Sequence, residues 1–142
     1  MHSIEQITQE LTWAIRQKEL NPELPLSAIK LPEDDLGMHL GLFHQNKLIT
    51  VVSLFEYGKE LQFRKFATDS NYQRMGFGKQ MMNYILAYAD ENQFTKVWCN
   101  ARTSASNFYK LFGFIETPET FSKNGIDYVI MKREASDLDK NQ

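Results

Sequence analysis

The sequence has little of several residue types on which other classes of protein depend. Cys99 is the single cysteine among 142 residues. This excludes an internal disulfide and a multi-cysteine metal cluster, and it fits a reducing cytoplasm. No apolar run approaches the roughly 20 residues of a membrane helix, and no cationic and apolar leader follows Met1. The net charge is −2, which disfavours a general nucleic-acid binder. We therefore expect a soluble cytoplasmic protein with no membrane or nucleic-acid partner.

The composition is that of an ordinary globular protein, with 42% hydrophobic and 24% charged residues. A chain of 142 residues supplies one core of normal size and has no room for a second. We expect a single domain over residues 1–142, with a polar tail from about residue 134.

The N-terminal part has apolar residues at helical spacing. Ile4, Ile7, Leu11 and Ile15 recur every three or four positions, which predicts a helix over residues 3–20 that begins with a capping box of Ser3 and Gln6. Three prolines follow between residues 21 and 35. They predict a surface connection that could form one wall of a substrate cleft.

The rest of the chain alternates strand and helix patterns. Apolar runs at 37–44 and 47–55 flank Gln45-Asn46 and predict a hairpin. The later elements are strands at 61–68, 96–99, 114–116 and 126–131, and helices at 78–91 and 104–112. This order predicts a mixed α/β fold in which helices cover a central sheet.

The segment Gln73-Arg74-Met75-Gly76-Phe77-Gly78 lies where a strand passes into a helix. Alternate glycines let a ligand approach the backbone, and the first N–H groups of a helix have no intrahelical acceptor, so a phosphate suits this position. Five basic and two acidic residues lie between positions 59 and 79, which adds local positive charge. The simpler alternative is that the glycines only ease packing at the helix start.

Two well-known phosphate loops do not fit this segment. A P-loop requires glycine at position 73 and serine or threonine at position 80, and both positions are glutamine. A dinucleotide fingerprint requires a small residue at position 81, which is Met81. The remaining candidate ligand is a pyrophosphate held by backbone groups.

The same segment resembles the Q/R-x-x-G-x-G/A signature of the GNAT superfamily of N-acetyltransferases. A second segment, Asn107-Phe108-Tyr109-Lys110-Leu111-Phe112-Gly113-Phe114, is similar to the F-Y-x-x-x-G-F segment of that superfamily. Tyr109 follows Gly78 by 31 residues, with a predicted helix, strand and helix between the two motifs. The resemblance covers roughly residues 11–132 and departs at Met75, where many members have glycine.

The resemblance implies a fold and a set of binding residues. The fold is a mixed, mostly antiparallel central sheet with splayed strands and helices on both faces. The co-substrate is acetyl-CoA, and no metal is used. The residues that match the family's cofactor-binding positions are Phe66, Ala67, Thr68, Gln73, Arg74, Met75, Gly76, Phe77, Gly78, Lys79 and Asn100.

The resemblance also assigns Tyr109 as the general acid that protonates the coenzyme A thiolate as it leaves. A phenol with a pKa near 10 holds its proton at neutral pH, so this role is chemically reasonable. For the general base we name Glu56, with His39 as a second candidate, although a strand-end glutamate is usually solvated and a histidine in an apolar strand is usually structural. Arg64 and Arg102 are candidates for recognising an acidic group on the substrate.

These assignments lead to one main hypothesis. The chain transfers an acetyl group from acetyl-CoA to a primary amine of a small molecule or peptide, by direct attack in a ternary complex, as a monomer or homodimer. The alternative is a catalytically silent CoA-binding sensor or interaction module. A generic anion-binding α/β domain is a third, weaker hypothesis.

Overall fold

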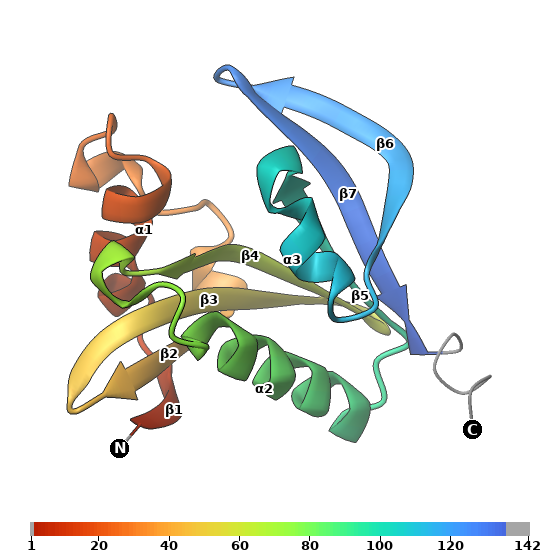
Figure 1. The fold of residues 1–142 in the computed structure, drawn as a ribbon, viewed down its shortest axis with the longest axis horizontal. Helices are drawn as coiled ribbons and strands as arrows, with labels where there is room; N and C mark the ends of the chain where they lie inside the picture. Colours follow the sequence, from red (N-terminus) through yellow and green to blue (C-terminus); the bar gives the residue numbers. More distant parts are fainter. Residues whose placement is uncertain (1, 136–142) are drawn as a thin grey trace. The chain divides into compact units, whose positions relative to one another are not determined.

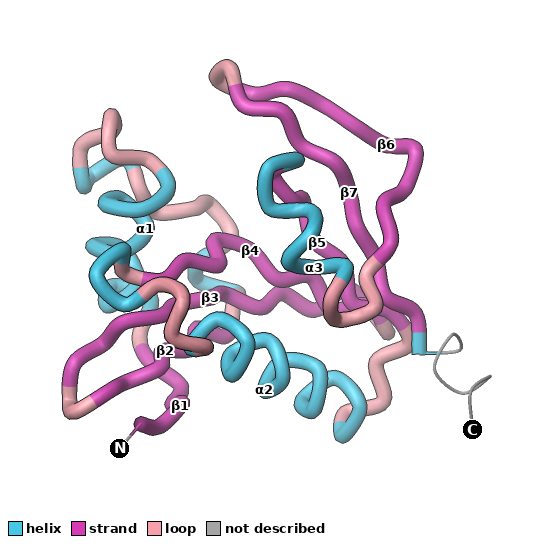
Figure 2. The backbone as a smooth tube through the Cα atoms, viewed as in Figure 1, coloured by secondary structure: helices cyan, strands magenta, loops and turns pink. Residues whose placement is uncertain are grey.

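The computed structural model describes residues 2–135. They form two compact units, one of residues 2–55 and 63–85 and the other of residues 56–62 and 86–135. Figure 1 labels the helices and strands, and Figure 2 distinguishes them from loops by colour. Hydrogen bonds link seven strands in the order β1-β2-β3-β4-β5-β7-β6. Most of the neighbouring strands are antiparallel, as predicted, and β4 and β5 are parallel.

The first unit contains the N-terminal strands and helix α1. Its strands are β1 (His2–Ile7), β2 (Met38–His44), most of β3 (Lys47–Tyr57) and the larger part of β4 (Glu60–Thr68). Helix α1 (Trp13–Leu20) packs on this unit through Ile15, which lies with Val51 and Ala67 in a buried cluster. The first part of helix α2 (Phe77–Glu91) also belongs here.

The predicted hairpin and the strand after it are confirmed. Gln45 and Asn46 connect β2 and β3 with left-handed backbone angles, φ 51° and 66°. An amide side chain tolerates this conformation better than a branched one, which is why the turn falls at this pair. The predicted surface connection between residues 21 and 35 is also confirmed, with short 3₁₀ turns at Leu26–Ala28 and Asp34–Leu36.

The predicted helix over residues 3–20 is wrong in its first half. Residues 2–7 form β1, which pairs with β2 so that Ile4 lies opposite Leu42. A 3₁₀ turn at Gln9–Thr12 then leads into α1. The capping box is absent, because the Ser3 hydroxyl donates to Glu5 instead. Pairing along the edge of β2 outweighs the local helical spacing, since it satisfies the backbone of the segment.

The second unit is built on antiparallel ladders. Strand β5 (Lys96–Arg102) pairs with β7 (Ile126–Glu134), which pairs with β6 (Ile115–Lys123). The start of β4 pairs in parallel with the start of β5. Helix α3 (Ser106–Lys110) contacts β6 and β7, and the long hairpin of these two strands is drawn in blue in Figure 1.

The late elements of the chain are placed as predicted, with different lengths. Strands β5, β6 and β7 are longer than their apolar runs, because ladder bonds extend through polar residues as well. Helix α3 is shorter than predicted and follows a 3₁₀ turn at Thr103–Ala105. The predicted polar tail begins at residue 134, and residues 136–142 of it lie outside the described part of the chain.

Candidate active site

Residues 73–76 connect the 3₁₀ turn at Ser70–Tyr72 to helix α2 in the first unit, and Phe77 and Gly78 begin that helix. Positions 73–76 are exposed. Arg74 and Gly76 have left-handed backbones, with φ of 66° and 86°. The amide of Gln80 donates to the Gly76 carbonyl at 3.1 Å and closes the first turn of the helix. The result is an exposed tight turn followed by helix N-terminal amides, which is a backbone arrangement that binds phosphate groups.

Two residues of α1 hold the chain just before this turn. Lys18 Nζ lies 3.0 Å from Asp69 Oδ1, and Glu19 accepts a 2.7 Å hydrogen bond from the Ser70 amide. Asp69 also accepts from the Asn71 amide at 2.9 Å. The hydrogen bond from this amide, together with Lys18, holds the pKa of Asp69 below its usual value. The entrance to the glycine segment is therefore fixed by ionised side chains.

The strand before the turn contains an irregularity that sequence reasoning missed. Lys65 has φ 57°, a left-handed conformation in the interior of β4. A left-handed residue within a strand interrupts the regular alternation of side chains and re-aims the backbone after it. After Lys65, Phe66 and Thr68 are half-buried and Ala67 is buried. Gln73 Nε2 donates to the Thr68 carbonyl at 3.0 Å, which ties the turn to the end of the strand.

The basic residues near the turn fall into two groups. Arg64 pairs with Glu33 at 3.3 Å, and the Lys65 ammonium lies 3.4 Å from an asparagine oxygen. Arg74 and Lys79 are exposed, and neither forms an ion pair within the described residues. These two cations flank the turn and suit an anionic ligand.

In the second unit, Tyr109 lies in an apolar and aromatic setting on α3. It is 9% exposed, and its ring contacts Phe108 and Phe114 at centroid distances of 5.3 and 6.1 Å. Burial, with the nearby Cys99, raises the pKa of Tyr109 above its usual value. Burial also raises the pKa of Cys99 to about 12. Both groups therefore stay protonated at neutral pH, as a phenol and a thiol.

Two of the other predicted residues of this unit are exposed, and Arg102 at the end of β5 is half-buried. Glu56 lies near the end of β3, and Asn100 lies in β5 opposite Ile130 of β7. An exposed carboxylate and an exposed amide are both accessible to a ligand.

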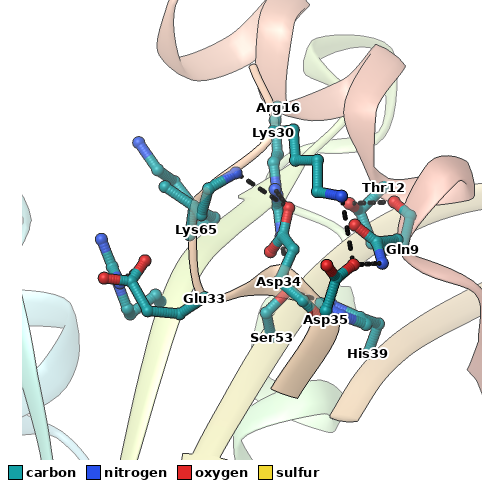
Figure 3. A network of polar contacts seen from close by, with 12 residues as sticks. Gln9, Thr12, Arg16, Lys30, Glu33, Asp34, Asp35, His39, Ser53 and Lys65 are labelled. Carbon is teal, nitrogen blue, oxygen red and sulfur yellow. Dashed lines mark hydrogen bonds and ion pairs between the residues drawn. The ribbon is translucent and has the colours of Figure 1, made fainter. Parts of the chain in front are cut away.

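A buried polar network connects α1 to the segment before β2 (Figure 3). Arg16 binds both carboxylate oxygens of Asp34, at 2.8 and 2.9 Å, and donates to Ser53 at 2.8 Å. The two ring nitrogens of His39 contact Ser53 Oγ at 2.7 Å and the Asp34 carbonyl at 2.9 Å. Arg16, Asp34, Ser53 and His39, which we call the buried tetrad, are all at most 4% exposed. The tetrad leaves neither nitrogen of His39 available to a substrate.

The tetrad fixes the turn at residues 31–37. Asp34 Oδ2 accepts from the Leu31 amide at 3.0 Å, and the Gly37 amide donates to the Asp34 carbonyl at 3.2 Å. Burial alone would raise the pKa of Asp34, but the hydrogen bonds from Arg16 and Leu31 outweigh it and hold that pKa below its usual value. Asp34 is therefore an ionised anchor inside the unit.

Sequence reasoning missed the tetrad, although one signal was present. Asp34 lies in a proline-rich connection that also contains several leucines, and Arg16 follows an apolar position of the helical stripe. Nothing in the spacing indicates that these two residues meet across 18 positions of the chain.

Two further features hold for the described residues, 2–135. Their His, Cys, Asp and Glu side chains form no group of three or more that could hold a metal ion. None of their helices combines the length and apolar character that crossing a membrane requires.

The fold agrees with comparisons to known proteins. The family model of the acetyltransferase (GNAT) domain matches residues 26–135. The chain belongs to the GNAT acetyltransferase family and is an acyl-CoA-dependent N-acetyltransferase.

Individual relatives extend this result over almost the whole chain. YitI of Bacillus subtilis, an uncharacterized N-acetyltransferase, is 28% identical over 141 residues, with 92% of this chain and 95% of YitI covered. A crystal structure from Lactobacillus plantarum has a TM-score of 0.82 at 22% identity and covers 94% of this chain and 97% of its own. A GNAT family acetyltransferase from Elizabethkingia anophelis, solved with acetyl-CoA bound, has a TM-score of 0.74 at 17% identity, covering 94% and 97%. The structural matches establish the shared fold.

Proposed function

We propose that this chain transfers an acetyl group from acetyl-CoA to a primary amine by direct attack in a ternary complex. In this proposal residues 1–142 act as one domain, and no metal takes part in the reaction. The observation that supports it most is the exposed turn at Arg74 and Gly76, whose left-handed backbone leads into the N-terminus of α2.

In this proposal the turn binds the pyrophosphate of acetyl-CoA. Backbone amides supply the hydrogen bonds, so side chains at these positions contribute little to binding. The Met75 side chain is 61% exposed, and in this proposal it does not block the pyrophosphate. Arg74 and Lys79 add positive charge. The other proposed contacts of the turn come from Gln73, Gly76, Phe77 and Gly78.

Strand β4 takes the pantetheine arm in the same proposal. Phe66, Ala67 and Thr68 pair with it as an added strand would, and an amide in this stretch faces the thioester carbonyl. In other enzymes, removing one hydrogen-bond donor to the developing oxyanion lowers the reaction rate roughly 10²–10³-fold. The left-handed Lys65 supports this role, because it re-aims the backbone just before these residues. Asn100 is the proposed further contact to the arm.

Tyr109 donates a proton to the departing thiolate, and Glu56 accepts the proton of the amine. Burial keeps the phenol of Tyr109 protonated at neutral pH, so the proton that the first role requires is present. The exposure of Glu56 supports the second only in that the carboxylate is accessible.

The experiment replaces Tyr109 by phenylalanine and compares it with Tyr128→Phe. Tyr128 is a half-buried tyrosine stacked on Phe121, so it controls for loss of a hydroxyl elsewhere in the same unit. Turnover with acetyl-CoA and a panel of amines should fall about 10²–10⁴-fold in Tyr109→Phe alone, with CoA affinity by calorimetry unchanged. The panel includes a peptide N-terminus, because a structural neighbour from Escherichia coli is named as a ribosomal-protein-S18-alanine N-acetyltransferase.

The outcomes separate the alternatives. Equal turnover in the two variants would remove Tyr109 as the acid. CoA binding without turnover on any amine would favour the silent sensor, and no CoA binding at millimolar concentration would remove the proposal.

A further inference from the structure

Arg64 is a half-buried guanidinium in the middle of β4, and little holds its nitrogens. Its side chain is 26% exposed and lies over the Phe55 ring, with Cζ 5.7 Å from the ring centre. Its one ion pair within the described residues is a 3.3 Å contact from Nη1 to Glu33 Oε2. A guanidinium has five N–H donors in a planar fork, so this single long contact leaves most of its hydrogen-bonding capacity unused.

The partner, Glu33, has a fixed backbone and an exposed carboxylate. It precedes Asp34 of the buried tetrad, and its own carbonyl accepts from the Leu36 amide at 2.9 Å. The Glu33 side chain is 43% exposed. An exposed single-contact ion pair of this kind is weak and easily displaced. The turn therefore holds Glu33 near Arg64, but their single contact leaves the guanidinium able to bind another carboxylate.

The charge around Arg64 favours an anion. Arg64 and Lys65 are adjacent cations, and Glu33 is the carboxylate that pairs with Arg64. The neighbouring carboxylates of Asp34 and Asp35 are paired with Arg16 and Lys30. The carboxylate next to Arg64 that is not held by another cation is therefore the exposed one of Glu33.

We propose that Arg64 is a recognition site for a carboxylate on the acceptor, so that the acceptor class is an amine that also has a carboxylate group. Glu33 occupies the guanidinium in the free protein and yields to the acceptor carboxylate, which makes two parallel bonds where Glu33 makes one. The inference rests on the proposed function for the position of the acetyl group. Arg64 lies two residues before Phe66 in β4, at the start of the stretch proposed to take the pantetheine arm. Because Arg64 and the proposed thioester contacts are different residues of the strand, we expect an acceptor whose amine and carboxylate are several bonds apart.

The experiment uses acceptor pairs that differ in the carboxylate alone. The pairs are γ-aminobutyrate with n-propylamine, ε-aminocaproate with n-pentylamine, and phenylalanine with phenethylamine. The carboxylated member should have the higher kcat/KM in at least the first two pairs. Arg64→Lys keeps the charge but loses the fork, and it should reduce this preference about 10–100-fold through KM for the acceptor, with KM for acetyl-CoA unchanged.

Two further variants sharpen the result. Glu33→Gln removes the competing carboxylate and should lower KM for γ-aminobutyrate a few-fold while leaving n-propylamine unaffected. Lys123→Ala, at an exposed cation in the second unit, should change neither. Equal kcat/KM within every pair, or a preference that survives Arg64→Gln, would overturn the inference.

A binding measurement separates this inference from the proposed function. Glutarate, which has no amine, is titrated into the CoA-saturated protein by calorimetry. Binding to the natural sequence and about a tenfold or greater loss in Arg64→Gln would support the carboxylate site even if no amine were acetylated, in which case the proposed transfer fails alone. Unchanged glutarate affinity in Arg64→Gln would contradict the site while leaving acetyl transfer in place.

Discussion

The two units differ in what they bury. The first buries an ionic network, with Arg16 and Asp34 at 0% and 1% exposure. The second buries mostly apolar groups, and its buried polar side chains within the described residues are Gln62 and Ser106. A buried ion pair costs desolvation that its attraction does not always repay, whereas apolar burial stabilises directly.

This difference follows from the backbone that each core supports. The antiparallel ladders of β5, β7 and β6 fix the second unit's strands by regular hydrogen bonds. The segment between α1 and β2 has short 3₁₀ turns in place of such ladders. The buried tetrad supplies the missing constraint through Asp34, whose carboxylate and carbonyl each accept several bonds. The tetrad thus defines a turn in the first unit, whereas backbone ladders hold the strands of the second unit.

Breaking the ion pair should have the largest effect. Arg16→Met leaves Asp34 charged and buried without its partner, so the free energy of unfolding should fall by about 3–5 kcal/mol. Urea denaturation followed by tryptophan fluorescence measures the loss. The matched control is the double variant Arg16→Met/Asp34→Asn, which removes both charges and should recover about half of the loss or more. A double variant no more stable than the single one would show that the charge balance is not what the tetrad supplies.

Truncating a buried apolar side chain in the second unit should lower the free energy of unfolding by a comparable or smaller amount. No second substitution that restores charge balance applies there. Met131 in β7 is 0% exposed, and Met131→Ala should cost about 2–5 kcal/mol by leaving a cavity. The isosteric change Met131→Leu should cost less than about 1.5 kcal/mol. Denaturation under the same conditions provides the comparison. A loss under 1 kcal/mol in Met131→Ala would mean that this core collapses around the deletion.

The sequence predicted the ladder-rich elements better than the irregular ones. The β2–β3 hairpin, β4 and α2 follow local patterns, because alternation and turn residues act over a few positions. The exposed glycine turn was predicted from the same local signal. By contrast, β1 was predicted as a helix, because its pairing with β2 joins residues more than 30 positions apart. The tetrad and the left-handed Lys65 were missed because they depend on tertiary packing.

Two glycines with left-handed backbones allow a comparison in which alanine should destabilise both units by the same small amount. Gly76 in the first unit and Gly125 in the β6–β7 turn have φ of 86° and 77°, and a Cβ at either would meet nothing within 4 Å. Alanine at each should therefore cost only the left-handed penalty, about 1–2 kcal/mol. Under the proposed function, Gly76→Ala alone should also weaken CoA binding, by about tenfold in calorimetry. Equal CoA affinity in the two variants would argue against pyrophosphate binding at this turn.

The two units should differ in how a buried ionisable group makes the free energy of unfolding depend on pH. In the second unit, burial raises the pKa of Cys99 to about 12, while a thiol in the unfolded chain titrates near 8.5–9. Above pH 9 the unfolded chain loses this proton and the folded one keeps it, so stability falls as pH rises. The loss from Cys99 should be about 1 kcal/mol at pH 9.5 relative to pH 7.5. Cys99→Ala should lack it, and identical pH profiles would contradict the burial of the thiol.

In the first unit the sign is reversed, because the pKa of Asp34 is held below its usual value. The folded state keeps Asp34 ionised while the unfolded chain takes up a proton below about pH 4, so stability is present above that pH and is lost as pH falls. The control is again Arg16→Met/Asp34→Asn, which has no titrating group at position 34. The stability difference between the natural sequence and this variant should shrink between pH 5 and pH 3 and stay constant from pH 7.5 to 9.5. If it shrank in the alkaline range instead, the ionised pair would not distinguish the first unit from the second.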